Sequence, residues 1–343
     1  MKTNLAKIFT PVFIMSILSF STAFSGKTLQ KSFPVGPGGT LNFHGARCHI
    51  ILEGTSRSDV SLRAECAKDI EDHYKVTFDQ GEESLGISVE PLFEKEGKSR
   101  FFGLFKSTRE YFGLEPSEYL TITISVPQGF NPYVKDSRGK VEIRSIDGRV
   151  EAYNSRGPIT IESVSGPVTV HNSRGCIALS RIEGTVEAKN SRGPINVTDV
   201  TGDTRLVNSR GTIEVEGLSG ALETSNSRGQ IEVAGLEGKI KARNSRGHIE
   251  VNFCQTPTED CELIASRGNI EIHLPAEKGA DISAAADRGK IASEIPLTVV
   301  GEVSKSRLEG RIADGGPRIE LTTSRGDIRI KTDKAVLSEN HQS

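Results

Sequence analysis

The chain has 343 residues, of which 35% are apolar and 26% charged, with 35 glycines, no tryptophan and a formal net charge of −2. This charge excludes a protein that binds nucleic acid through a basic overall surface. Because the apolar fraction is low and glycine is abundant, the composition favours a narrow, turn-rich β structure over a compact α/β enzyme.

Residues 1–25 have the layout of a secretory signal peptide. Two lysines precede an apolar run over residues 8–20, and small residues follow it up to Ser25. The run is interrupted by Pro11 and is too short to span a bilayer. We therefore expect an exported, soluble chain without a transmembrane segment, located in the periplasm, at the cell surface or outside the cell.

Residues 26–130 are expected to form an N-terminal β capping region. Runs such as TLNFHG, HIILEG and YLTITISVP alternate apolar and polar residues, as half-buried strands do. The exposed end of a repetitive β structure needs protection against edge-to-edge association, and this region is placed to provide it.

An aromatic insertion over residues 93–119 interrupts the cap, with basic residues between its aromatic ones. Three of its phenylalanines would share one face of a short helix. The insertion is expected either to fold over the core of the cap or to contact a membrane surface or a partner protein. The candidate interface residues are Phe101, Phe102, Phe105 and Phe112.

β-solenoid repeats follow over residues 131–333, with a strict period of 18 residues up to Gly247. The triplet Ser-Arg-Gly ends at Gly139 and recurs at every eighteenth residue up to Gly247, with alternating β-branched residues between the glycines. Two short strands per repeat cannot bury their apolar sides alone, so successive repeats must stack in parallel. The sequence predicts an all-β, parallel β-solenoid (β-helix) of about ten coils.

Beyond Gly247 the repeat spacing lengthens. The run LEGRIADGGPRIELTTSRGDIRIKTD returns to the strand-and-glycine pattern and is expected to close the stack. The polar tail over residues 334–343 is expected to be disordered.

The asparagine before each Ser-Arg-Gly corner is expected to be structural. Its position has the parity of the inward residues, so the amides should stack inside the solenoid, bonding to one another and to the backbone at the corner. These residues are Asn154, Asn172, Asn190, Asn208, Asn226 and Asn244.

The corner arginines are expected to line one edge of the solenoid, which we call the Arg edge. One interpretation is structural, with the guanidinium groups paired to Glu142, Glu214, Glu232 and Glu250. The other is a linear binding edge for acidic polysaccharide or a phosphate-bearing envelope polymer. The residues of the Arg edge are Arg138, Arg156, Arg174, Arg192, Arg210, Arg228 and Arg246.

Five cysteines agree with an oxidising compartment. Cys48 and Cys66 lie in consecutive strand-like runs and could bridge a hairpin. Cys254 and Cys261 bracket a six-residue loop and could close a short ring. Cys176 is then expected to be an exposed free thiol.

Catalytic and cofactor motifs are missing from the sequence. The histidines show no metal-ligand spacing, and there is no nucleophile elbow, P-loop, dinucleotide fingerprint or calcium β-roll pattern. We therefore expect no cofactor, no metal and no enzyme activity. The alternative is a carbohydrate-active β-helix enzyme that uses outward carboxylates such as Glu214, Glu232 and Glu250.

Three stretches resemble a known family. The opening KSFPVGPGGTLNFHGARCHIILEG, the middle VEIRSIDGRVEAYNSRGPITIESVSGPVTVHNSRG and the closing GRIADGGPRIELTTSRGDIRI are similar to the bacterial extracytoplasmic "putative-adhesin" β-solenoid family, a domain of unknown function. The resemblance covers nearly the whole chain after residue 26. It implies a β-solenoid with an adhesin-like role, and it brings no site residues.

Taken with the signal peptide, these features predict a non-catalytic binding or scaffolding protein of the bacterial cell envelope. Its expected partners are acidic envelope polysaccharide or another envelope protein, and not nucleic acid. A membrane-proximal stress or assembly factor that acts through residues 93–119 is a further alternative.

Overall fold

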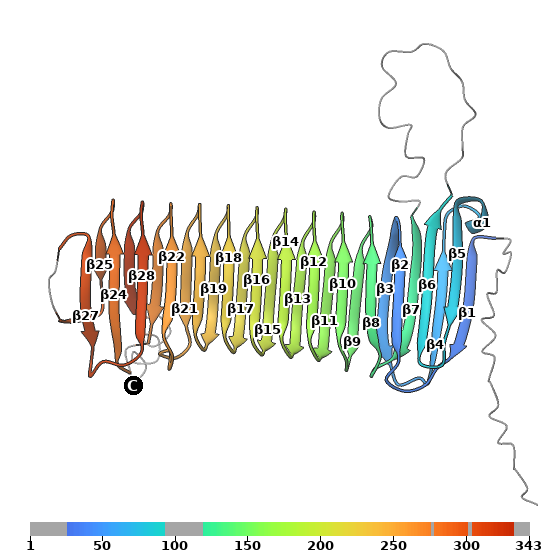
Figure 1. Ribbon diagram of the computed structural model, residues 1–343, viewed down its shortest axis with the longest axis horizontal. Helices are drawn as coiled ribbons and strands as arrows, with labels where there is room; N and C mark the ends of the chain where they lie inside the picture. Colours follow the sequence, from blue (N-terminus) through green and yellow to red (C-terminus); the bar gives the residue numbers. More distant parts are fainter. Residues whose placement is uncertain (1–25, 93–118, 276–277, 301–303, 333–343) are drawn as a thin grey trace, which may run out of the picture.

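The computed structural model describes residues 26–92, 119–275, 278–300 and 304–332, and these ranges are almost entirely β structure (Figure 1). One short helix, α1 (Ile70–His73), occurs among the described residues. The N-terminal strands are β1 (Thr28–Pro34), β2 (Thr40–Gly45), β3 (Cys48–Thr55), β4 (Asp59–Glu65), β5 (Tyr74–Gln80), β6 (Ser84–Pro91), β7 (Leu120–Pro127) and β8 (Asn131–Asp136).

The regular region follows with two strands in each coil. It consists of β9 (Val141–Ile146), β10 (Val150–Asn154), β11 (Ile159–Ser165), β12 (Val168–Asn172), β13 (Ile177–Glu183), β14 (Val186–Asn190), β15 (Ile195–Thr201), β16 (Thr204–Asn208), β17 (Ile213–Ser219), β18 (Leu222–Asn226), β19 (Ile231–Glu237), β20 (Ile240–Asn244), β21 (Ile249–Phe253) and β22 (Cys261–Ala265). The C-terminal strands are β23 (Ile270–Leu274), β24 (Ala280–Ala286), β25 (Ile291–Ser293), β26 (Thr298–Val299), β27 (Arg307–Ile312), β28 (Arg318–Thr323) and β29 (Ile328–Thr332).

Two sheets run along the length of the molecule. Sheet A has 14 strands in the order β1-β4-β7-β3-β9-β11-β13-β15-β17-β19-β21-β23-β29-β25. Sheet B has 15 strands in the order β26-β27-β24-β28-β22-β20-β18-β16-β14-β12-β10-β8-β2-β6-β5. Each regular coil contributes one strand to each sheet, so neighbouring coils lie about 4.8 Å apart.

The register between coils follows the 18-residue repeat. Ile159 pairs with Ile177 in sheet A, and Asn154 pairs with Asn172 in sheet B, both in parallel strands. The same parallel pairing continues from β8 to β22 and from β9 to β23. The predicted parallel β-solenoid is therefore confirmed.

The core is a thin apolar column between the two sheets. In β11, Ile159, Ile161 and Val164 are each at most 2% exposed, whereas the intervening side chains lie on the outer face. Ser163 has a positive φ of 57°. This local bulge allows both Ile161 and Val164 to point inward although they are three residues apart.

At the N-terminal end the sheets continue past residue 130 without a break. β2 pairs in parallel with β8, and β3 pairs in parallel with β9. The antiparallel strands β1, β4 and β5 lie beyond them at the sheet edges (Figure 1). Both sheets are therefore continuous across the expected boundary at residue 130.

At the C-terminal end, the run expected to close the stack does so only through β27, next to the edge of sheet B. The last two strands, β28 and β29, pair with β22 and β23 and so lie inside the stack. The earlier strands β24 and β25 lie outside them, and the antiparallel pair β27 and β26 forms the edge of sheet B. The chain thus leaves the stack after β23 and returns to fill the position that it skipped.

The expected bridge between Cys48 and Cys66 is also wrong. β7 lies between β3 and β4, because Cys48 pairs with Leu120 while Glu65 pairs with Thr121 from the other side. The two cysteines are separated by two strand spacings, about 10 Å, which exceeds the Cα separation that a disulfide allows. Cys48 is instead a buried thiol that donates to the carbonyl of Ala46 (3.6 Å).

Cys254 and Cys261 are not bridged in the structure either. The Cys261 thiol is buried and donates to the carbonyl of Glu259 (3.5 Å), whereas Cys254 is exposed. Cys176 is half-buried rather than exposed, and burial raises the pKa of its thiol, which lowers its reactivity.

No helix within the described ranges is long and apolar enough to cross a bilayer. Residues 1–25 and 93–118, which include the expected signal peptide and Phe101, Phe102, Phe105 and Phe112, lie outside the described residues. The same holds for the expected disordered tail over residues 334–343.

Candidate functional site

Six successive coils, those of β10 to β20, pass from sheet B to sheet A at an Asn-Ser-Arg-Gly corner. In the corner after β14, Asn190 is 4% exposed, while the side chain of Arg192 lies at the surface. Gly193 has a φ of 116°, and a Cβ on it would lie 2.3 Å from the carbonyl oxygen of Gly175 in the preceding coil. The corner therefore requires glycine, and it sends asparagine inward and arginine outward in each of these six repeats.

The buried asparagine connects two coils through the backbone. The Asn190 amide donates to the carbonyl of Gly175 (2.7 Å), and its oxygen accepts from the backbone N–H of Arg192 (3.3 Å). The same two bonds recur at Asn154, Asn172, Asn208, Asn226 and Asn244. Across the described residues these amides bond to backbone groups and not to one another, unlike the expected amide ladder.

Replacing Asn208 by alanine should destabilise the protein by about 2–3 kcal/mol, because the carbonyl of Gly193 and the N–H of Arg210 lose their buried partner. The shift of the urea unfolding midpoint measures this loss. The neighbouring change Ser209→Ala removes an exposed hydroxyl and should alter the stability by less than about 0.5 kcal/mol. Equal effects of the two changes would contradict a structural role for the amide.

The Arg edge is a row of exposed guanidinium groups, one at each corner. Six of its members are exposed, and Arg138 at the first corner is half-buried. The carbonyls of the six arginines from Arg156 to Arg246 each accept from the corner glycine of the preceding coil, as Arg192 does from Gly175 (3.0 Å). This bond holds successive arginines one coil spacing apart, about 4.8 Å.

The expected pairing of this edge with glutamates does not occur. Glu142 instead pairs with Lys140 and with Arg144 (3.3 Å), and Glu250 lies beside two histidines. Within the described ranges Glu214 and Glu232 make no ion pair, and neither do the six arginines from Arg156 to Arg246. The part of the row from Arg156 to Arg246 therefore carries positive charge without ion pairs in the described structure.

Basic residues on the outer face of sheet B behave differently. Arg205 pairs with Glu223 (2.6 Å) and Arg243 with Glu262 (2.7 Å). Lys239 pairs with Glu259 (2.6 Å), and Lys241 lies 3.6 Å from Glu262. These four cations contact three carboxylates, with Glu262 shared by Lys241 and Arg243, whereas the corner arginines from Arg156 to Arg246 contact none in the part of the chain that the structure describes.

A shallow groove runs along sheet B next to the corners. Its lining includes Lys135, Tyr153, His171 and Lys189, together with serines of the corners. Burial, and then the charge of Lys189, lower the pKa of His171, so its imidazole is neutral at physiological pH. Lys189 pairs with Glu187 on its own strand, so the uncompensated positive charge of the groove comes from Lys135.

An aromatic row continues from this groove, and it was not predicted from the sequence. The ring centroids of His44, Tyr133, Tyr153 and His171 are 5.1–5.5 Å apart from one ring to the next. The available signal was the residue before the corner asparagine, which is Tyr153 in one coil and His171 in the next. The aromatic pattern covers only two coils, because the next two coils have Lys189 and Val207 at this position.

Outward carboxylates form a column on sheet A. Glu214, Glu232, Glu250 and Glu271 are register partners in successive coils. A shallow groove lies over the first three of them and over Asn196. This column contains the glutamates that the enzyme alternative would use.

The comparisons with known proteins identify one family. The model of the family described as Toastrack DUF4097 matches residues 43–331. No curated protein sequence matches the chain.

Two solved structures are similar to this chain at 12% sequence identity. One is described as a putative cell adhesion protein from Clostridium sporogenes; the match covers 90% of this chain and 100% of that chain, with a TM-score of 0.18. The other is described as a putative adhesin from Bacteroides fragilis; the match covers 90% of this chain and 97% of that chain, with a TM-score of 0.31.

Proposed function

Because the chain belongs to the Toastrack DUF4097 family of β-solenoids, we propose that it is a non-catalytic, adhesin-like binding protein of the bacterial envelope whose Arg edge holds a linear polyanion. The observation that carries this proposal is the row of six exposed arginines, from Arg156 to Arg246, without ion pairs among the described residues. The ligand class is an acidic polysaccharide or a phosphate-bearing polymer.

The spacing of the row favours a polymer over a small anion. Two like charges about 4.8 Å apart repel by about 1 kcal/mol even in water, so bound anions relieve a cost that accumulates along the edge. A guanidinium group binds carboxylate or phosphate through paired N–H donors. A linear chain with one anionic group per unit can contact several corners, and each contact raises the effective concentration for the next.

The groove beside the corners supports an acidic polysaccharide. Lys135 adds positive charge next to the Arg edge, Lys189 is paired with Glu187, and the rings of Tyr153 and His171 lie between the two lysines. Aromatic rings offer an apolar face with a polar rim, which suits a ring-shaped polar ligand. Export to the envelope follows from the signal-peptide layout of residues 1–25 and is part of the proposal.

The enzyme alternative is less well supported for an acidic substrate. The column of Glu214, Glu232 and Glu250 would repel the carboxylates of an acidic polysaccharide. Among the described residues, no pair of these carboxylates differs from the others in a way that would mark it as a catalytic acid and base. The membrane-proximal alternative depends on residues 93–119, of which the structure describes only Tyr119.

Binding of polygalacturonate and of polyphosphate across a salt series tests the proposal, with neutral dextran as the inactive polymer. Arg174, Arg192, Arg210 and Arg228 are changed together to glutamine. If each contact contributes about 0.7 kcal/mol, within the usual range for exposed ion pairs, the variant should bind about 100-fold more weakly. Its plot of log affinity against log salt should be shallower by about three, because four fewer charges are neutralised.

The matched control changes Arg205, Lys239, Lys241 and Arg243 to glutamine. It removes the same net charge from paired positions on sheet B. Binding should remain within a few-fold of the unmodified protein. Equal losses in both variants would mean that net charge alone attracts the polymer, and no binding by the unmodified protein would refute the polyanion site.

A further inference from the structure

The fold brings together two histidines and two glutamates that lie apart in the sequence. Glu250 on β21 and Glu271 on β23 are register partners on the outer face of sheet A. His273 follows Glu271 by two residues and so shares its face, and His248 directly precedes β21. The step between these coils is 21 residues because a loop follows β21, which hides the alignment from a search for an 18-residue spacing.

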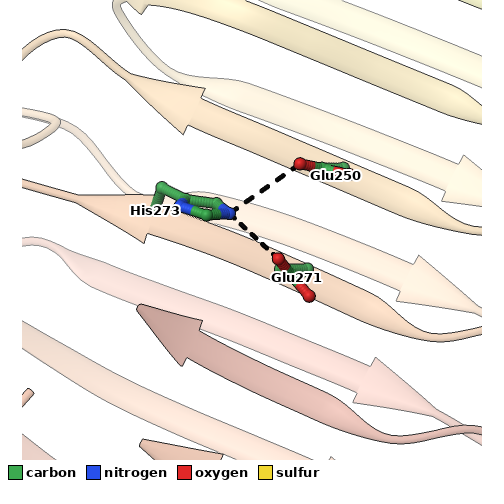
Figure 2. Close-up of side chains that lie close together, drawn as sticks. All are labelled: Glu250, Glu271 and His273. Atoms are coloured by element: carbon green, nitrogen blue, oxygen red, sulfur yellow. Dashed lines mark hydrogen bonds and ion pairs between the residues drawn. The ribbon is translucent and has the colours of Figure 1, made fainter. Parts of the chain in front are cut away.

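The donor atoms of this cluster converge, as Figure 2 shows for three of the four side chains. His273 Nε2 lies 3.0 Å from Glu271 Oε1 and 3.8 Å from Glu250 Oε1. His248 Nε2 lies 3.7 Å from Glu250 Oε2. Glu250, Glu271 and His273 each offer one ligand atom within 4.8 Å of the others.

These separations suit a small tetrahedral ion. Ligand atoms about 2.0–2.1 Å from a common zinc ion lie about 3.3 Å from one another, within the range seen here. An imidazole nitrogen with two carboxylate oxygens favours Zn²⁺ over Ca²⁺ or Mg²⁺, which prefer oxygen-only sites. We propose that Glu250, Glu271 and His273 form a binding site for Zn²⁺ or a similar transition-metal ion that links two adjacent coils, with His248 beside Glu250 as an outer neighbour.

The surroundings of the cluster are compatible with an ion. The His273 and Glu271 side chains are each 12% exposed, so they are held within the surface. Lys331 Nζ, on β29, lies 2.5 Å from Glu271 Oε1, and Arg329 on the same strand lies 3.9 Å from Glu271 Oε2. Lys331 contacts the same oxygen, Oε1, that faces His273, and this oxygen has two lone pairs, so it can bind an ion through one and keep Lys331 on the other as a partner that orients the ligand.

A second observation lies at the same place. Asn252, the register partner of His273, has a side-chain oxygen that is shielded from solvent and accepts no hydrogen bond among the described residues. A water molecule bound to a metal ion in this cluster could donate the hydrogen bond that the Asn252 oxygen lacks.

Zinc titration of the untagged full chain after removal of metals tests the site, with calorimetry as the readout. The test variant is His273→Ala/Glu250→Gln. The control is His44→Ala/Glu232→Gln, which makes the same two changes at an exposed histidine of sheet B and at the register partner of Glu250 one coil away. The unmodified chain and the control should each bind one Zn²⁺, and the test variant should bind at least about 100-fold more weakly.

Two further measurements distinguish the loss of a metal site from the loss of folding. Bound Zn²⁺ should raise the thermal midpoint of the unmodified chain and of the control but not of the test variant, while all three melt alike in chelator. Co²⁺ bound to the same site should show the visible absorption of a nitrogen- and oxygen-ligated tetrahedral ion. No saturable zinc binding, equal binding by the test variant, or equal binding of Ca²⁺ would each overturn the proposal.

Discussion

Replacing Gly193 by alanine is expected to destabilise the solenoid by about 3–5 kcal/mol, one of the two largest effects that the structure predicts. The new Cβ would lie 2.3 Å from the carbonyl oxygen of Gly175 and 2.8 Å from its carbon, so the backbone of two coils must separate. Such overpacking costs about 1–3 kcal/mol, and a φ of 116° adds a strain of similar size for alanine.

Urea unfolding of Gly193→Ala beside Gly129→Ala measures this effect. Gly129 lies in the turn before β8, where a Cβ would have no atom within 4 Å, so its replacement should change the stability by less than about 0.5 kcal/mol. A loss below about 1 kcal/mol at Gly193 would show that the coils can separate at the corner more easily than their close contact implies.

The central coils could be predicted from the sequence because their interactions repeat. Each coil contacts copies of itself, so the 18-residue period sets the partner of every strand. Asn190 and Gly193 each recur with the same parity and the same neighbours, which is why the inward asparagine and the tight corner follow from the repeat pattern alone. The position of the Arg edge follows from the pattern for the same reason.

The ends of the stack could not be predicted, because pairing there depends on contacts between segments far apart in the chain. Nothing near Cys48 indicates that Leu120 will pair with it and separate it from Cys66. Likewise, β28 pairs with β22 across 53 residues of chain, from Ala265 to Arg318, and displaces the intervening strands to the edge. Local patterns identify such strands but not their order.

Interactions between side chains on the outer faces could not be predicted from the sequence either. Glu142 has the spacing to reach a corner arginine, but Lys140 and Arg144 are nearer on its own strand and neutralise it. The cluster of His248, Glu250, Glu271 and His273 exists because a loop lengthens one coil while the register between coils is kept. The spacing of these residues along the sequence matches no metal-binding motif. The pairing of β21 with β23 brings the side chains together.

The first corner differs from the others because an aspartate replaces the inward asparagine. Asp136 is the register partner of Asn154 and is 3% exposed. One of its oxygens accepts from the N–H of Arg138 (3.0 Å), and the other is buried without a hydrogen bond in the described structure. Burial raises the pKa of Asp136 from 3.8 to about 7, although the backbone N–H groups of Ser137 and Arg138 favour the ionised form.

Asp136→Asn is therefore expected to stabilise the protein at neutral and alkaline pH by up to about 4 kcal/mol, since each pKa unit corresponds to about 1.4 kcal/mol. Below pH 3.8 the carboxyl group is protonated in both the folded and the unfolded chain. Between pH 3.8 and about 7 only the unfolded chain ionises, so the stability contributed by this group falls as pH rises. Above about pH 7 the folded chain carries the full free-energy cost of burying the ionised carboxylate. Asparagine is uncharged and has no such cost.

Urea unfolding at about pH 4, 6 and 8 compares the unmodified protein, Asp136→Asn and the reciprocal change Asn154→Asp one coil away. The gain from Asp136→Asn should be small at the lowest pH and largest at the highest. Asn154→Asp should show the opposite trend, because it creates a second buried carboxyl at the same position of the next coil. Parallel pH profiles for all three proteins would mean that the first corner opens to water, and that burial does not set the ionisation of Asp136.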